Sequence, residues 1–147
     1  MLRHGLSVML LTFIFSAGCS EGDASIKPGV IVRGKLLKSG QPLSVPNQAV
    51  GAGMVQVALI PVDKLSEPER ALAKSDGTFQ IVGSGKGLAA GRYKLVVFQR
   101  DRGIESDQLA GAFNEKNTPI TVELPASKVG GQIDLGDFDL DIYLKKN

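Results

Sequence analysis

Cys19 is the only cysteine in the 147-residue chain, and a thiol can act as a nucleophile, a metal ligand or an attachment point. It directly follows the small residues 16–18 (Ser-Ala-Gly), which in turn follow an apolar run over Leu6–Phe15. A basic start at Arg3, a short apolar stretch and a small-residue junction are the parts of a secretory signal peptide. The pattern predicts an exported protein whose first remaining residue is Cys19.

A cysteine just past such a junction resembles the lipoprotein signal of bacteria, in which the thiol is the attachment point for lipid. Ser16 stands where that signal usually carries an aliphatic residue, whereas residues 17–18 (Ala-Gly) match it. The resemblance implies that residues 1–18 are a lipoprotein signal peptide and that Cys19 is lipidated. Ser20, in place of an acidic residue, implies delivery to the outer membrane instead of retention at the inner one.

Two other interpretations of this segment fit less well. A membrane-spanning helix needs about 20 apolar residues, and Glu21 and Asp23 follow too soon. A plain secretory signal would leave a stray thiol in an oxidising compartment. Lipid attachment explains both the position of Cys19 and the presence of a single cysteine in the chain. A multiply acylated amino terminus gives a firm membrane anchor. Residues 19–29 then comprise the lipidated cysteine and a polar tether.

Removal of residues 1–18 also removes His4, the only histidine, and leaves 129 residues, the size of one ordinary domain. Ser–His and Cys–His nucleophilic pairs and histidine-containing zinc sites are thereby excluded. The remaining carboxylate, lysine, tyrosine and serine side chains form no recognisable catalytic group. We therefore expect a protein that is not an enzyme and that carries no cofactor and no metal.

Charge gives no sign of a nucleic-acid partner. Without Arg3, 16 of the 17 basic residues remain against 15 acidic residues, which leaves a net charge of +1. The basic residues are scattered instead of clustered, so the sequence lacks the basic patch that binds phosphate backbones.

The chain from Val30 onward alternates apolar and polar residues and carries turn residues about every ten positions. This spacing is typical of an all-β sandwich or barrel, and we expect an antiparallel, two-layered fold over residues 30–147. The stretch from Met54 is nearly all apolar and predicts a central strand covered on both faces, with Pro61 at its end. The expected strands are Val30–Leu37, Met54–Val62, Thr78–Val82, Arg92–Arg100, Ile120–Leu124 and a last one over residues 133–142.

Turns and one irregularity follow from local residue types. Residues 39–40 (Ser-Gly) predict a turn, and residues 76–77 (Asp-Gly) predict a tight hairpin, because both residues of that pair tolerate positive φ. In the last strand Ile133 and Leu135 lie in odd register, but Phe138, Leu140 and Ile142 lie in even register. One face cannot bury both sets without an extra residue, so we expect a bulge near Gly136.

Helix is scarce. The segment 64–74 is compatible with helix, strand or loop, although Ser66 and Glu69 match a capping box that would start a short helix through Leu72. Residues 106–113 have room for a single helical turn.

Several motifs stand in an order that resembles the transthyretin-like, carboxypeptidase-regulatory-like domain, over about residues 30–144. This resemblance implies a Greek-key β-sandwich of seven strands; in carboxypeptidases the domain is accessory to catalysis and carries no active site. The motifs are Gly34-Lys35-Leu36-Leu37 followed by Gly40-Gln41-Pro42-Leu43, then Val57–Val62, Ser75–Phe79, Ala89–Leu95 and Phe113–Ile120.

Two groups of residues superficially suggest ligand sites. Asp137, Asp139 and Asp141, with Asp134 before them, alternate with apolar residues, so we expect them on one solvated strand face where they diverge instead of converging on calcium. Residues 83–87 (Gly-Ser-Gly-Lys-Gly) lack the spacing of a phosphate loop and precede a strand, so we expect a plain loop.

The sequence therefore predicts a lipid-anchored interaction or structural module of the cell envelope, whose partner is the membrane through Cys19 and an envelope protein or polysaccharide. The longest irregular segments, Pro42–Gly53 and Arg102–Thr118, are the candidate recognition surface. A module that binds a small ligand or carbohydrate is the alternative. It is weakened because the chain has no tryptophan and Tyr93 falls on a core position, which leaves Tyr143 as the free aromatic ring.

Labelled palmitate tests the anchor. We expect the label to enter the wild-type chain in a bacterial host but not the Cys19→Ala variant, because the thiol is the acceptor. Equal labelling of both chains would refute lipid attachment at this position.

Overall fold

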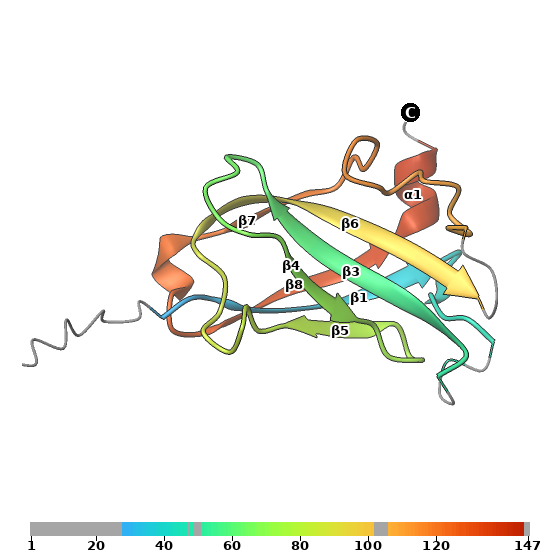
Figure 1. Ribbon diagram of the computed structural model, residues 1–147, viewed down its shortest axis with the longest axis horizontal. Coiled ribbons are helices and arrows are strands. Elements are labelled where there is room, and N and C mark those ends of the chain that lie inside the picture. Colours follow the sequence, from blue (N-terminus) through green and yellow to red (C-terminus); the bar gives the residue numbers. More distant parts are fainter. Residues whose placement is uncertain (1–27, 47, 49–50, 102–105, 146–147) are drawn as a thin grey trace, which may run out of the picture.

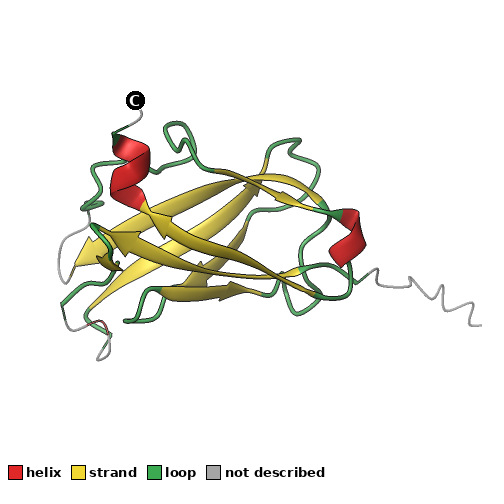
Figure 2. Cartoon of the chain, turned by 180° about the vertical axis from the view of Figure 1, so that it is seen from behind, coloured by secondary structure: helices red, strands yellow, loops and turns green. Residues whose placement is uncertain are grey.

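Alternating apolar residues build two β-sheets that pack face to face (Figures 1 and 2). The computed structural model describes residues 28–46, 48, 51–101 and 106–145. One sheet contains β1 (Ile31–Lys38), β2 (Gln41–Pro42), β5 (Thr78–Ile81) and β8 (Gln132–Asp139). The other has the order β4 (Glu69–Leu72), β3 (Gly53–Pro61), β6 (Gly91–Asp101) and β7 (Thr121–Leu124). A 3-10 helix (Ala126–Lys128) precedes β8, and α1 (Leu140–Leu144) follows it.

The core lies between the sheets and is formed by alternate residues of each strand, as the sequence predicts. Side chains of a strand point to opposite faces in turn, so the residues of one parity meet the facing sheet. Burial of these apolar faces provides the main driving force for folding. The fully or almost fully buried strand residues include Val32, Leu36, Val55, Val57, Leu59, Phe79, Ile81, Tyr93, Leu95, Val97, Val122, Leu124 and Phe138.

The longest strands, β3 and β6, form the centre of the second sheet. They pair antiparallel from Gly53 opposite Asp101 to Pro61 opposite Tyr93, which places Pro61 at the strand end as expected. The outer face of β3 is less covered than the sequence suggests. Ala58 is buried there, but Met54 is 39% exposed. The expectation of a strand covered on both faces is therefore wrong for the start of β3.

The first sheet corrects the expectation of a wholly antiparallel fold. β8 runs parallel to β1, because the chain crosses between the sheets after β7 and enters β8 at the same end where β1 begins. Arg33 pairs with Asp134 and Lys35 with Asp137, so one extra residue stands in β8 opposite Gly34. Gly136 has a φ of 77° at this point, which confirms the predicted bulge.

The last strand is shorter than expected. β8 ends at Asp139, whose carboxylate accepts a hydrogen bond from the Asp141 amide and caps α1. Leu140 is buried, in keeping with its predicted role, but Ile142 is 55% exposed because the helical turn rotates it away from the core. The alternation of residues 137–142 predicts a buried strand position for Ile142, and this prediction is wrong because Ile142 lies in α1.

Both predicted turns form. Ser39 and Gly40 have φ values of 51° and 72° and join β1 to β2 in a two-residue hairpin. Gly77, with a φ of 79°, completes the second turn, in which the Asp76 carboxylate accepts hydrogen bonds from the amide and hydroxyl of Thr78. These bonds hold the pKa of Asp76 below its ordinary value. This turn does not close a hairpin within one sheet, because it leads from β4 in one sheet to β5 in the other.

The helices suggested within 66–72 and 106–113 do not form. Residues 69–72 are strand β4 instead, since pairing with β3 from Leu59 to Gln56 satisfies their backbone. Residues 106–113 form successive turns, in which the Ala110 amide donates to the Asp107 carbonyl and the Ala112 amide to the Leu109 carbonyl. In residues 69–72, tertiary pairing overrides a weak local helix signal, and in residues 106–113 local turns replace the helical turn.

The bulge gives a stability test. Nothing lies within 4 Å of a Cβ placed on Gly136, so Gly136→Ala introduces only the cost of a side chain at positive φ. We expect the free energy of unfolding to fall by about 1 kcal/mol. Gly131→Ala is the matched control, because Gly131 lacks positive φ and its Cβ would make ordinary contact with the Lys128 carbonyl. It should be neutral or stabilising by up to about 1 kcal/mol. Urea unfolding of both variants measures the difference, and equal effects would contradict the strained-bulge interpretation.

Candidate functional site

The predicted lipid site, Cys19, and most of the tether lie outside the described residues, but the structure shows where the chain enters the sandwich. The Gly29 amide donates to the Lys86 carbonyl at 2.5 Å, and the Gly130 amide donates to the Gly29 carbonyl at 2.8 Å. Val30 forms a bridge with Leu88. We call this end of the sandwich, formed by residues 28–30, 61–67, 82–91 and 125–131, the tether end (left in Figure 1).

Other connections between strands lie at the opposite end of the sandwich, which we call the distal end (right in Figure 1). The β1–β2 hairpin lies there, as do the start of β3 and the end of β6, where Gly53 pairs with Asp101. α1 lies there too, since β8 runs parallel to β1 and Leu37 pairs with Asp139 just before the helix. The chain thus enters at one end, while both candidate recognition loops begin at the other.

Gln99 connects the two candidate loops. It is 9% exposed on the inward face of β6, in series with Tyr93, Leu95 and Val97. Its side-chain amide donates to the Ser44 carbonyl at 3.0 Å in the first loop. Its backbone carbonyl accepts from the Gln108 amide at 2.7 Å in the second loop. A buried polar side chain is costly unless it is hydrogen-bonded, so this residue fixes the spacing of the two loops.

The loop after β6 is compact and held by its own polar side chains over residues 106–118. The Asp107 carboxylate accepts from the amides of Gln99, Leu109 and Gly111 at 3.0–3.1 Å. The Thr118 hydroxyl donates to the Leu95 carbonyl at 2.6 Å. Because Phe113 is fully buried beneath these bonds, the loop is part of the core as well as of the surface.

The loop after β2 is anchored in a similar way. Leu43 and Val45 are buried, and the Gln48 side chain donates to the Ala73 carbonyl at 2.5 Å. Residues 47 and 49–50 of this loop, and 102–105 of the other, lie outside the described residues. The described parts form a fixed surface in which side chains such as Ser44, Ser106 and Gln108 are exposed.

The carboxylate group near the carboxyl terminus is arranged differently from the expectation. Asp139 and Asp141 do not diverge along a strand face but converge on the β1–β2 hairpin. The Asp139 carboxylate accepts from the Ser39 amide at 3.2 Å and the Gly40 amide at 2.7 Å, and Asp141 accepts from the Ser39 hydroxyl. These aspartates therefore fix the distal hairpin. Over the described ranges, no three His, Cys, Asp or Glu side chains are grouped so as to hold a metal ion.

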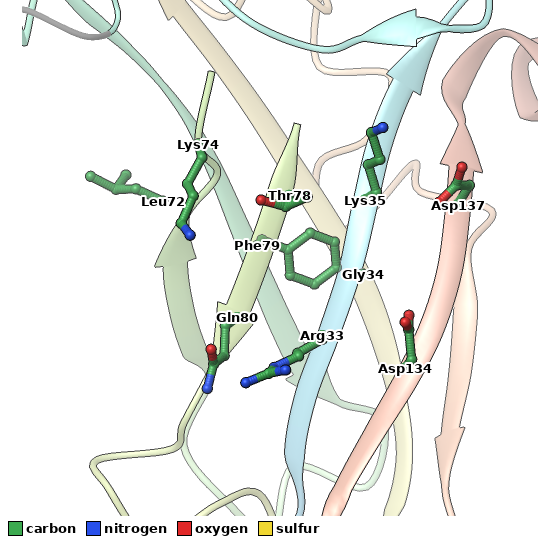
Figure 3. A pocket seen from close by; sticks show the side chains of 10 residues that line it. All are labelled: Arg33, Gly34, Lys35, Leu72, Lys74, Thr78, Phe79, Gln80, Asp134 and Asp137. Atoms are coloured by element: carbon green, nitrogen blue, oxygen red, sulfur yellow. The ribbon is translucent and has the colours of Figure 1, made fainter. Parts of the chain in front are cut away.

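A shallow groove of about 580 Å³ crosses the outer face of the first sheet (Figure 3). Arg33 and Lys35 rise from β1, between Asp134 and Asp137 on β8 and the polar side chains of β5. The register places the backbone of Arg33 opposite Asp134 and that of Lys35 opposite Asp137, while the Arg33 side chain extends toward Gln80 on β5 (Figure 3). The remaining lining residues are Gly34, Leu72, Lys74, Thr78, Phe79 and Gln80.

The lining of the groove offers polar groups to a ligand. Rows of opposite charge place donors and acceptors side by side. The Thr78 hydroxyl donates to the carboxylate of Asp76, a turn residue outside the groove lining. The lining side chains include no histidine or cysteine.

The two tyrosines are not free to stack on a sugar ring. Tyr93 is 3% exposed, as its sequence parity predicts, and its hydroxyl donates to the Ala89 carbonyl at 2.8 Å. Burial raises the pKa of this phenol above its ordinary value. Tyr143, expected to be free, is half-buried and packs against the core.

Comparisons with known protein families, with curated proteins and with solved structures find no match for this chain. Among the described residues, no helix is sufficiently long and apolar to cross a membrane.

Sequence reasoning located the two loops but missed the residues that join them. Gln99 carries a usable signal, because it continues the inward series of β6 in a position where an apolar residue is expected. Asp107 carries only the preference of aspartate for turns, which fits its bonds to the nearby Leu109 and Gly111 amides but gives no sign of its bond to the Gln99 amide in β6.

Asp139 provides a test of how the distal end is held. We expect Asp139→Ala to lower the free energy of unfolding by about 2 kcal/mol, because it removes the α1 cap and leaves the Ser39 and Gly40 amides without their acceptor. Asp137→Ala, at an exposed position on the same strand, should change it by less than about 0.5 kcal/mol. Thermal unfolding compares the two, and similar losses would show that Asp139 does not fix the hairpin.

Proposed function

We propose that this chain is an exported lipoprotein, anchored through lipid on Cys19 to the outer membrane, whose β-sandwich serves as a non-enzymatic interaction module of the cell envelope. The observation that carries the proposal is the polarity of the sandwich. The tether joins one end, and Gln99 holds the two longest loops together at the other. Such an arrangement presents a fixed loop surface away from the anchor.

The strand connections support a Greek-key, transthyretin-like domain. Over the described residues the chain passes from β1 and β2 to β3 and β4 in the facing sheet, back to β5, over to β6 and β7, and back again to β8. Repeated crossing between two packed sheets is typical of Greek-key sandwiches. Leaving out the two-residue β2, seven strands are present in this part of the chain. This matches the seven that the resemblance implies.

The distribution of reactive groups favours binding over catalysis. The sequence after residue 18 has no histidine and only one thiol, which the lipid would occupy. At the distal end the carboxylates of Asp107 and Asp139 accept bonds from backbone amides. Groups committed to holding the backbone are poor candidates for moving protons.

A second candidate function is the binding of a small polar ligand or carbohydrate in the groove over β8, β1 and β5. The basic residues Arg33 and Lys35 and the acidic residues Asp134 and Asp137 all line the groove, and this favours it, since they would hold a ligand with both donors and acceptors. The lack of an exposed tyrosine argues against stacking of a sugar ring.

Photo-crosslinking in intact cells separates the two functions. A photoreactive amino acid replaces Gln108 at the distal loops or Gln80 in the groove, two exposed glutamines on different surfaces. We expect one reproducible protein adduct from position 108 and none from position 80, because the loops carry recognition.

Adducts confined to position 80, or carbohydrate retained there, would favour the groove and overturn the loop assignment. Adduct formation at position 108 should also require Cys19, because the anchor sets the distance to the partner. If a Cys19→Ala chain is exported and still forms the same adduct, the interaction does not depend on the anchor.

A further inference from the structure

Three connecting segments at the tether end each carry one exposed apolar side chain and one lysine. The loop after β3 carries Lys64 and Leu65, the loop after β5 carries Val82 and Lys86, and the segment after β7 carries Lys128 and Val129. Leu65 is 86% exposed, Val82 42% and Val129 43%. We call these six residues the tether-end surface. Each apolar side chain has a lysine on the same loop, and this pattern is typical of surfaces that bind membrane interfaces.

Two of the three segments are joined through the backbone of Gly29, which fixes their positions relative to each other. The loop 82–88 and the segment 128–131 both bond to Gly29. A Cβ on Gly29 would overlap the backbone of Gly87, and a Cβ on Gly87 would overlap the backbone of Gly29. The chain at Gly29 and the loop 82–88 are therefore in close backbone contact, which only glycine allows. Leu65 is held at the tip of its loop, since its amide donates to the Asp63 carboxylate at 3.1 Å and the Lys64 amide to the Pro61 carbonyl at 3.3 Å.

The charge of the tether-end surface suits an anionic partner. Lys64, Lys86 and Lys128 outnumber the nearby carboxylates Asp63 and Glu67. Lysines close to a membrane are attracted by anionic headgroups, while apolar side chains enter the boundary between headgroups and acyl chains. At the distal end the charge around an exposed apolar side chain is mixed, because Ile142 is close in sequence to Asp139 and Asp141 and also to the exposed Lys145.

Chain length places this surface near a membrane. Eight residues, 20–27, separate Cys19 from Pro28, and they can span at most about 30 Å. We propose that the tether-end surface docks on an anionic phospholipid surface, with Leu65, Val82 and Val129 in the interface and the three lysines on the headgroups. This inference rests on the proposed anchor and adds an orientation to it. Docking would hold the distal loops away from the membrane.

The chain contains no tryptophan, which makes a direct test possible. Chains that start at Cys19 are coupled through this thiol to a maleimide phospholipid in vesicles of phosphatidylglycerol and phosphatidylcholine. Leu65→Trp reports on the tether end, and Ile142→Trp is the control at a similarly apolar, exposed distal site. We expect the emission of the Trp at position 65 to shift to shorter wavelength and to be quenched several-fold by brominated acyl chains. The Trp at position 142 should show neither change.

A triple variant, Lys64→Glu, Lys86→Glu and Lys128→Glu, supplies the charge control in the Leu65→Trp background. It should lose most of the quenching, and so should the unmodified Leu65→Trp chain on vesicles of phosphatidylcholine alone. Equal quenching at positions 65 and 142, no quenching at either, or quenching that ignores headgroup charge would each overturn the docking proposal. Because the vesicles supply the lipid chemically, these outcomes do not depend on acylation in cells, which palmitate labelling tests separately.

Discussion

The parallel pairing of β1 with β8 is the constraint on which the rest of the molecule depends. β1 begins where the chain enters, at Val30, and runs to the hairpin at Ser39 and Gly40. Since β8 runs the same way beside it, the end of β8 and α1 must lie at the far end from the tether. If β8 had paired antiparallel with β1, it would have ended at the tether end, and the carboxyl terminus would lie there. The polarity of the sandwich, and with it the separation of the proposed anchor from the candidate recognition surface, follows from this single pairing.

Buried polar groups give both ends of the sandwich their shape. Gln99 and Asp107 hold the loops at the distal end, and the contacts of Gly29 with Gly87 and Gly130 hold the chain at the tether end. The bond from Gln99 to Ser44 and the contacts of Gly29 join segments that are far apart in the sequence, whereas Asp107 bonds to residues near it in the chain. The apolar core stabilises the two sheets, but these polar and glycine contacts decide how the connections between the strands are arranged. A recognition surface made from such loops needs little ordering when a partner binds.

The outer surfaces of the two sheets differ in character. The first sheet presents alternating charges in register, with the backbones of Arg33 and Lys35 opposite those of Asp134 and Asp137. Such pairing covers the exposed face of the parallel strands with charge and discourages association through it. The second sheet leaves Met54 and Leu72 exposed at 39% and 59%. Together with the basic and apolar loops of the tether end, these surfaces give the sandwich distinct sides, although its core is an ordinary two-layer one.

The sequence by itself determined most of the strands, most of their inward faces and the bulge at Gly136, because burial imposes a period of two that can be read from residue types alone. It also placed the turns at Ser39 and Asp76, whose residue types tolerate positive φ. It could not determine that β8 runs parallel to β1, that residues 69–72 pair as a strand, or that Asp139 and Asp141 meet Ser39. These features depend on which distant segments become neighbours, and local residue preferences carry no information about that choice. Only the tertiary structure brought Gln99 to both loops and gathered Leu65, Val82 and Val129 at the end where the chain begins.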